Sequence, residues 1–433
     1  MSPRIERRTI SVSALARVEG EGAMTVRVKD GAVDGVELRL YEPPRFFEGL
    51  LRGRSYTEPP DITARICGIC PVAYQMTACR AIEHAAGVVV DGPIDQLRRL
   101  LYCGEWIQSH ALHIYLLHAP DFLGYDGAVE MAADHRGAVE RGLALKKAGN
   151  QIMALIGGRA VHPVNVRVGG FYRVPSRAEL RTLAAVLEPA LAAALETVAW
   201  VATFDFPDLD VGAPLVALHD PDGYAVMGGR ITSSDGIDAA PPRFPELFAE
   251  YQVPHSTALQ SRIIGAGPYL CGPIARYSLN SAQLTPEASE AAGAAGLGPS
   301  CRSLFRSIIV RAVEVVEACA QALRIIERYE EPPMPALPVD ATGGTGHACT
   351  EAPRGLLYHR YQVGEDGLIA SAQITPPTSQ NQAQIEHDLA TFVGSNLDLG
   401  VPELTHRCEQ LIRSYDPCIS CATHFLTLRV EGR

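Results

Sequence analysis

The spacing of apolar residues is strand-like between residues 10 and 40 and becomes helical from residue 71. Between residues 10 and 40, alternate positions are apolar on both sides of an Asp30-Gly31 turn: Met24, Val26 and Val28 before it, and Val36, Leu38 and Leu40 after it. This pattern predicts a hairpin or small sheet. We therefore interpret residues 1–60 as a β-rich N-terminal part.

Beyond residue 61, apolar positions recur every three to four residues over long stretches, which is typical of amphipathic helices. Ser176 and Glu179 form the clearest start signal, a capping box. The predicted helices cover residues 71–86, 95–118, 177–203, 302–328 and 403–415. Residues 207–285 are rich in Pro and Gly, and we interpret them as an irregular excursion within one integrated unit, 61–433. The predicted fold is mainly α, within the α+β class: a bundle of long helices with peripheral β-hairpins.

Charge and hydropathy restrict the partners. The formal net charge is −11 with no basic block, which argues against nucleic acid and anionic membranes. The N-terminus has no apolar signal region, and the longest apolar stretch is interrupted by Glu188, Pro189 and Glu196. We therefore expect a cytoplasmic chain without a membrane span. Its eleven cysteines should then be reduced thiols, available for metal binding.

Two C-x-x-C pairs lie near opposite ends of the chain: "RICGIC" at 65–70 and "DPCISC" at 416–421. Both fall at predicted helix starts, with Asp416 as the expected N-cap of the second helix. The spacing lets both sulfurs of a pair face one point, and four thiolates suit zinc, iron, nickel or a cluster.

A structural zinc site in a non-redox scaffold is the alternative for such pairs. Zinc-ribbon pairs usually lie about 15–20 residues apart, unlike these. The entropic cost of closing a loop grows only with the logarithm of its length, so the long span between the two cysteine pairs is allowed. A large helical core does not need a metal to fold. We therefore favour a metal that performs chemistry.

Residues 351–381 carry a predicted hairpin centred near 365–366, which would place Arg354 opposite Pro377 and Thr378. A guanidinium, a hydroxyl and backbone groups would then form a donor-rich pocket for a small anion or polarised ligand. A surface salt bridge of Arg354 is the alternative. Glu19 in "RVEGEG" would usually be solvated, but beside thiolates it could carry protons.

The sequence resembles, nearly end to end, the large catalytic subunit of nickel–iron hydrogenases. The motifs that carry the resemblance occur in the family's order: "RVEGEG", "RFFEGLLRGR", "RICGIC", "ALHIYLLHAPD", "GGRAVHP" with a later "GGF", "EAPRG", "PPTSQN" and "DPCISCATH". The quinone-site subunit of respiratory complex I shares the family's fold but has lost the four cysteines. All four are present here.

The resemblance implies one nickel and one iron on four cysteines, inserted by maturation factors. Cys67 and Cys418 would be terminal nickel ligands, and Cys70 and Cys421 would bridge nickel to iron. The iron would carry carbon monoxide and two cyanides. The implied reaction is the heterolytic cleavage of dihydrogen.

The same resemblance assigns roles around the metals. Arg354, Thr378 and Pro377 would hydrogen-bond the cyanides, and Arg354 would also lie over the open metal position. Asp121 and Asp416 would orient Arg354.

Three further residues follow from the resemblance. Glu19 would relay the proton released at Cys418. Glu48 and His424 would bind a magnesium or a second iron near the C-terminus. Residue Tyr74 departs from the family, because many members have a histidine there that donates to the bridging sulfur.

Partners are implied as well. Electrons would leave to iron–sulfur clusters of a separate small subunit, because the remaining cysteines are scattered. The segment "RICGICPVAYQM" looks most like that of the cytosolic multisubunit hydrogenases, whose flavin-bearing partner subunits form an NAD(P) diaphorase. This chain has no G-x-G-x-x-G fingerprint after a strand, so a nucleotide would bind elsewhere.

Overall fold

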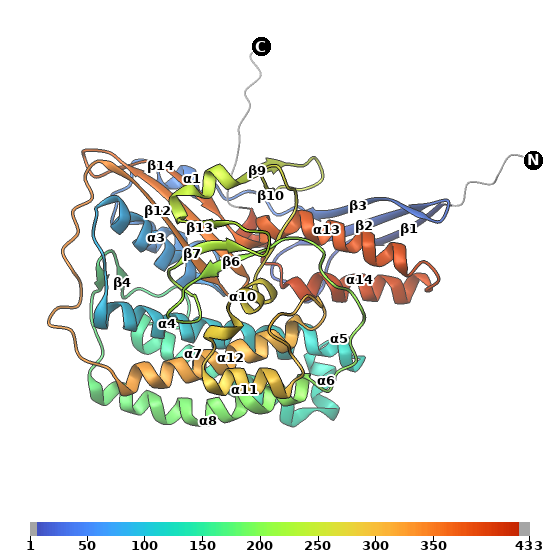
Figure 1. The fold of residues 1–433 in the computed structure, drawn as a ribbon, viewed down its shortest axis with the longest axis horizontal. Coiled ribbons are helices and arrows are strands. Elements are labelled where there is room, and N and C mark those ends of the chain that lie inside the picture. The colour runs from blue at the N-terminus through green and yellow to red at the C-terminus, as the bar shows by residue number, and fades with distance from the viewer. Residues whose placement is uncertain (1–6, 424–433) are drawn as a thin grey trace, which may run out of the picture.

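The computed structural model describes residues 7–423 and has a layer of long helices with small sheets packed above it (Figure 1). The layer consists of α4 (Gly92–Leu112), α7 (Arg136–Gly157), α8 (Arg177–Val201) and α12 (Ser307–Glu327). In Figure 1, α8 runs along the lower edge, and α3 (Pro71–Ala85) lies higher, against the sheet at the upper left. The predicted capping box of α8 is confirmed at Ser176 and Glu179.

Glycines let α4 and α7 approach closely. A Cβ on Gly149 would lie 2.6 Å from the carbonyl oxygen of Gly104, and one on Gly104 would lie 2.8 Å from Cβ of Ile152. Such distances leave no space for a side chain between the helices. The sequence patterns did not predict α7, because its glycines weaken helix propensity. Here they serve helix–helix packing.

The predicted N-terminal hairpin or small sheet is confirmed as a three-stranded sheet. Strands β1 (Arg7–Val12), β2 (Gly22–Lys29) and β3 (Ala32–Leu40) are antiparallel in that order. Asp30 and Gly31 both have positive φ, as a tight hairpin turn requires. Met24 and Val26 are buried beneath the sheet.

A second three-stranded sheet contains the predicted C-terminal hairpin. Strands β12 (Gly344–Ala352), β13 (Gly355–Val363) and β14 (Ile369–Thr375) are antiparallel neighbours. Ala352 pairs with Gly355, so Arg354 lies in a two-residue turn and not opposite Pro377. The chain enters α13 (Pro377–Ser395) directly after β14.

The segment 207–285 is more regular than expected. It contributes a four-stranded sheet, a two-stranded sheet and a helix: β6 (Leu215–His219), β7 (Arg230–Ser233), β8 (Asp238–Ala239), β11 (Leu270–Cys271), β9 (Phe248–Gln252), β10 (Leu259–Ile263) and α10 (Pro273–Asn280). The prediction of an irregular excursion was wrong here, because strands this short carry too few residues to show a period.

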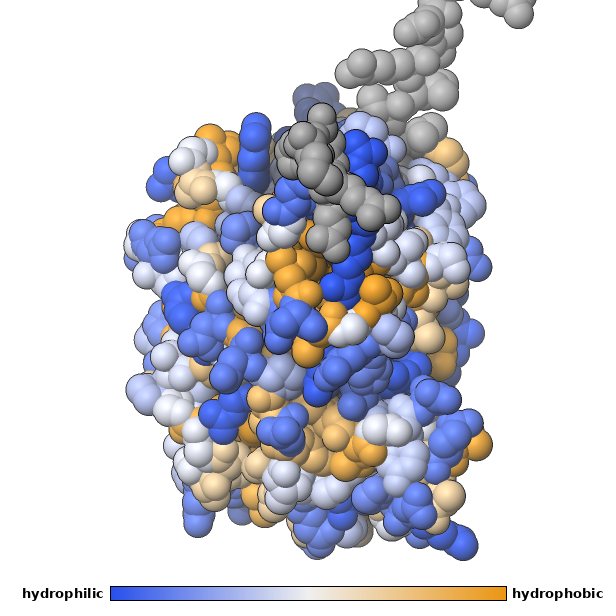
Figure 2. Space-filling view, turned by 90° about the vertical axis from the view of Figure 1, so that its right-hand side faces the viewer, coloured by the Kyte–Doolittle hydropathy of each residue, from blue (hydrophilic) through white to orange (hydrophobic). Residues whose placement is uncertain are grey.

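Shorter elements complete the described chain. They are α1 (Phe47–Leu51), α2 (Pro59–Thr63), η1 (Ala64–Ile66), η2 (His113–His118), α5 (Ala119–Leu123), α6 (Ala128–Asp134), β4 (Val166–Arg167), β5 (Gly170–Phe171), η3 (Pro241–Arg243), α9 (Phe244–Leu247), η4 (Ser281–Gln283), α11 (Pro286–Ala294), α14 (Val401–Tyr415) and α15 (Ile419–Ala422). The face that Figure 2 shows is a mosaic of polar residues with apolar ones in small groups, as is usual for a globular protein.

One described helix, α8, is long and apolar enough to cross a membrane, with a mean hydropathy of 1.5 over its best window. This differs from the prediction of no such run. Only 33% of that window is buried, although α8 packs along α12 and α7. A single helix of this kind is weak evidence for a span, because core helices pass the same test.

The glycine contact between α4 and α7 yields a stability prediction. Gly149→Ala should lower the free energy of unfolding by about 1–3 kcal/mol, because the methyl group would push the two backbones apart. Gly137→Ala on the same helix is the control. Its Cβ meets nothing within 4 Å, so it should be neutral or stabilise by up to about 1 kcal/mol. Urea unfolding midpoints of both variants check the account, and equal midpoints would contradict it.

Candidate metal centre

Four buried cysteines from opposite ends of the chain converge on one point. The sulfurs of Cys67, Cys70, Cys418 and Cys421 all lie within 4.8 Å of one another. The closest cross-pairs are Cys67 with Cys418, at 3.4 Å, and Cys70 with Cys421, at 3.6 Å. The two C-terminal sulfurs are 2.7 Å apart. The predicted meeting of the two motifs is therefore confirmed.

Local structure presents each pair. Cys70 is the N-cap of α3, with Pro71 as the first helical residue, which agrees with the helix predicted over residues 71–86. The second prediction was wrong: Cys418, not Asp416, caps α15. Asp416 closes α14 with a φ of 53°. It does not cap α15, because that helix begins at Ile419, and Asp416 lies two residues before its N-cap.

The N-terminal part of the chain holds the second motif in place. The backbone N–H of Ile419 donates to the carbonyl of Glu19 at 2.9 Å, which joins the two segments in a short parallel bridge. Gly20 has a φ of 90°, and a Cβ there would lie 2.7 Å from Cβ of Ile419. The glycine in "RVEGEG" is thus needed both for its conformation and for the close approach. Thr378 adds a third tie, because its hydroxyl accepts from the N–H of Cys418 at 2.9 Å.

Glu19 contacts the sulfur cluster directly. Its Oε2 lies 3.0 Å from the sulfur of Cys418 and accepts from the backbone N–H of Ser420 at 3.1 Å. The hydroxyl of Ser420 donates to Oε2 of Glu42 at 3.0 Å. Glu42 is only partly buried, so this series of polar groups leads from the sulfurs toward the surface. Sequence patterns missed Ser420 and Glu42, which are isolated polar residues in no recognisable motif.

Arg354 is buried close to the sulfurs. Its Nε donates to the carbonyl of Asp416 at 2.8 Å, and its Nη2 donates to the Asp416 carboxylate at 3.1 Å. Burial would lower the pKa of Arg354, but the charges of Asp416 and of the sulfurs, Cys418 foremost, outweigh it and raise that pKa. Nη1 is buried and has no hydrogen-bond partner among the described residues. It is therefore available to a ligand.

The turn that carries Arg354 is held by Arg276 of α10. Arg276 donates from Nη1 to the carbonyl of Ala352 and from Nη2 to that of Pro353, both at 2.8 Å. A bidentate ion pair with Glu314 on α12, with both contacts at 2.8 Å, orients its guanidinium. No sequence signal pointed to Arg276, since its partners come from α12 and β12.

Asp121 does not orient Arg354, and this prediction was wrong. Its carboxylate receives Nε and Nη2 of Arg413 at 2.7 and 2.8 Å, and Arg17 at 2.5 Å. Burial would raise the pKa of Asp121, but the Arg413 charge and hydrogen bonds prevail and lower it. Asp121 therefore links α5 to Arg413 of α14, and its carboxylate is occupied by Arg413 and Arg17.

The remaining expected residues are only partly described. Glu48 on α1 accepts the backbone N–H of Ile374 at 2.7 Å. His424 lies outside the described residues, so the expected magnesium or iron site stays a prediction. Pro377 and Thr378 begin α13 and are both buried.

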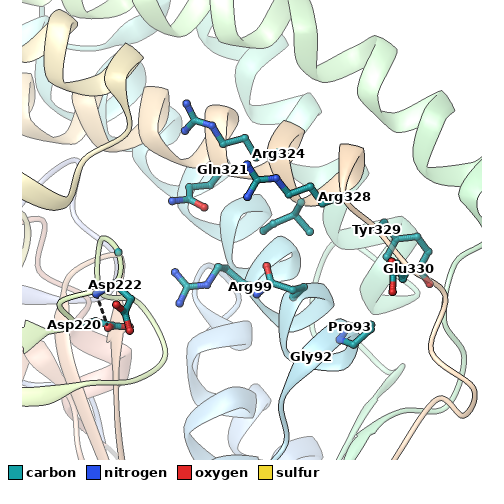
Figure 3. A pocket seen from close by; sticks show the side chains of 13 residues that line it. Gly92, Pro93, Arg99, Asp220, Asp222, Gln321, Arg324, Arg328, Tyr329 and Glu330 are labelled. Atoms are coloured by element: carbon teal, nitrogen blue, oxygen red, sulfur yellow. Dashed lines mark hydrogen bonds between the residues drawn. The ribbon is translucent and has the colours of Figure 1, made fainter.

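A charged surface cavity lies away from this centre (Figure 3). It has a volume of about 650 Å³ and is lined by residues of α4, α12 and the loop near Asp220. In Figure 3, Arg99, Arg324 and Arg328 extend along it, and Asp220 and Asp222 stand across from them. None of the predicted site residues lines it, so the chemistry is assigned to the sulfurs.

The donor set fits a metal pair. The hydrogen bond with Cys418 lowers the pKa of Cys67, whereas burial raises the pKa of Cys418 and of Cys421. Four buried thiolates would repel one another, so all four can ionise only around bound cations. Soft thiolate donors suit nickel and iron.

Comparisons with known proteins agree with this site. A family model described as "Nickel-dependent hydrogenase" matches residues 45–142 and 302–424. "Sulfhydrogenase 1 subunit alpha" of Pyrococcus furiosus is 33% identical over 429 residues, covering 97% of this chain and 98% of that protein. "Sulfhydrogenase 2 subunit alpha" of the same organism is 32% identical, covering 97% and 100%.

A solved structure confirms the predicted fold. The one titled "Crystal structure of NAD+-reducing [NiFe]-hydrogenase in the H2-reduced state" matches with a TM-score of 0.86 and 26% identity. The match covers 96% of this chain and 99% of the other. The chain thus belongs to the nickel-dependent hydrogenase family and is the catalytic subunit of a nickel–iron hydrogenase, with its metal site on the four clustered cysteines.

Proposed function

We propose that Cys67 and Cys418 bind nickel terminally and that Cys70 and Cys421 bridge it to iron. The four-sulfur cluster supports binding of a metal pair, because all four sulfurs lie within 4.8 Å of one another. Bound nickel and iron supply the Lewis acidity for heterolytic cleavage of dihydrogen.

Glu19 takes up the proton released at the sulfur of Cys418. The 3.0 Å contact between its Oε2 and that sulfur is a hydrogen-bonding distance for an S–H donor. The backbone N–H of Ser420 donates to Glu19 and holds its carboxylate beside the sulfur.

Arg354, Thr378 and Pro377 hold the cyanides of an iron that also carries carbon monoxide. Nη1 of Arg354 is a buried donor without a partner in the described chain, so an anionic ligand would satisfy it. The Thr378 hydroxyl accepts from Cys418, which leaves its own hydrogen to donate. Asp416 keeps the guanidinium of Arg354 in position.

Electrons leave to iron–sulfur clusters in a separate small subunit. Among the described residues, the only group of His, Cys, Asp and Glu that could hold a metal is the four-cysteine cluster. The likeness to an NAD+-reducing hydrogenase supports flavin-bearing partners and NAD(P)+ as acceptor, in the cytoplasm. Glu48 and His424 bind magnesium or a second iron, and maturation factors install the nickel and iron.

The buried four-sulfur cluster carries this proposal, and metal analysis tests it. The complex purified with its partners should contain one nickel per chain and show infrared bands of carbon monoxide and cyanide. Zinc in place of nickel, without those bands, would indicate a structural scaffold instead.

Glu19→Gln tests the proton route. The amide cannot accept the proton, so hydrogen–deuterium exchange should fall by about 10²–10⁴-fold while nickel content stays unchanged. Glu21→Gln is the matched control, because Glu21 is exposed two residues away and should exchange normally. Mass spectrometry of HD formed from D₂ in H₂O gives the rate, and normal exchange in Glu19→Gln would remove Glu19 from the route.

A further inference from the structure

The charged cavity between α4, α12 and the loop near Asp220 plays no part in the proposed cleavage of dihydrogen (Figure 3). Its volume of about 650 Å³ lies in the range of cavities that hold small organic ligands. None of the four clustered cysteines lines it, so it is separate from the metal centre. Its side chains therefore point to a ligand of their own.

Three arginines make one wall of the cavity strongly positive. Arg324 lies in the last turn of α12, and Arg328 follows as the cap of that helix. Arg99 extends from α4 into the same space (Figure 3). Like charges that line one cavity repel one another unless an anion lies between them. The chain as a whole carries a net charge of −11, so this concentration of positive charge departs from the overall balance.

The chain itself neutralises little of this charge. Arg324 forms an ion pair with Glu287, at 2.7 Å between Nη2 and Oε2. Arg99 has only a long contact, 3.5 Å from its Nη1 to the carbonyl oxygen of Tyr224. The guanidinium of Arg328 is exposed and makes no ion pair among residues 7–423. Arg99 and Arg328 are therefore available to an anion, and guanidinium groups match the geometry of phosphate.

Acidic groups occupy the opposite wall. Asp220 and Asp222 belong to a tight turn, in which Oδ1 of Asp220 accepts the backbone N–H of Asp222 at 3.1 Å. Neither carboxylate pairs with an arginine in the described part of the chain, although both share the cavity with three of them. Such carboxylates would repel nucleic acid or an acidic peptide. They would accept hydrogen bonds from hydroxyl groups, as acidic residues do from ribose in dinucleotide sites.

We propose that this cavity binds a sugar phosphate, either free or as part of a nucleotide. The phosphate lies between Arg99 and Arg328, and the sugar hydroxyls donate to Asp220 and Asp222. One ligand thus satisfies two walls of opposite charge that the chain leaves unpaired. The inference does not depend on the proposed metal chemistry, because the cavity shares no residue with the sulfur cluster.

Hydrogen–deuterium exchange of the purified complex tests the site, because it locates a ligand even if partner subunits bind nucleotides elsewhere. Ribose 5-phosphate, ADP and inorganic phosphate are added separately. Ribose 5-phosphate or ADP should slow amide exchange in residues 219–224 and 324–330, where the ligand orders both walls. Protection by both supports a site for the sugar phosphate itself, and protection by ADP alone supports a site for a nucleotide.

Two results would overturn the proposal. One is that none of the three compounds protects these segments. The other is that inorganic phosphate protects them at the same concentration as ribose 5-phosphate or ADP, since phosphate alone has no sugar hydroxyls for the aspartates.

Variants of exposed residues test each wall without disturbing the fold. Arg328→Gln should weaken binding of the protecting ligand on the order of tenfold, because a charged hydrogen bond is lost. Asp222→Ala should weaken that binding but not the weaker binding of inorganic phosphate. Arg136→Gln is the control, because Arg136 is an exposed arginine of α7 that does not line the cavity. An affinity equal to wild type in Arg328→Gln or in Asp222→Ala would contradict the proposed binding mode.

Discussion

The constraint on which the structure depends is the meeting of four sulfurs from two ends of the chain. Cys67 and Cys70 precede the helical core, and Cys418 and Cys421 follow it, yet all four sulfurs lie within 4.8 Å of one another. The backbone bridge between Glu19 and Ile419 and the closely packed Gly20 serve this meeting. The large core folds through its own apolar contacts and brings the two ends of the chain together. The metals are then not needed to hold the fold and are available for chemistry.

Buried charged side chains lie around the four sulfurs. Arg354 lies beside them, and Asp416 sits between Arg354 and Arg311, which lies 3.8 Å from the other carboxylate oxygen of Asp416. Burial lowers the pKa of Arg311 to about 10, so it remains charged at neutral pH. Buried cations offset part of the thiolate charge, and the ion pair of Arg276 with Glu314 fixes the turn that carries Arg354. The site thus depends on side chains from α10 and α12, far from either cysteine motif in the sequence.

Sequence reasoning was most successful where local rules decide the structure. The capping box of α8, the Asp30-Gly31 turn and the start of α3 after Cys70 follow from residues adjacent in the chain. It failed where distant contacts decide. Helix α7 depends on glycines that fit only because α4 lies against them. Asp416 was expected to cap a helix, and Asp121 to orient Arg354, but which arginine reaches which carboxylate is a property of the folded chain.

The most direct test of the central claim is X-ray absorption at the nickel edge of the purified complex. If the four cysteines hold a nickel–iron pair, the nickel shell should consist of sulfur ligands with an iron neighbour beyond them. A shell of nitrogen and oxygen, or no iron scattering near the nickel, would contradict the account.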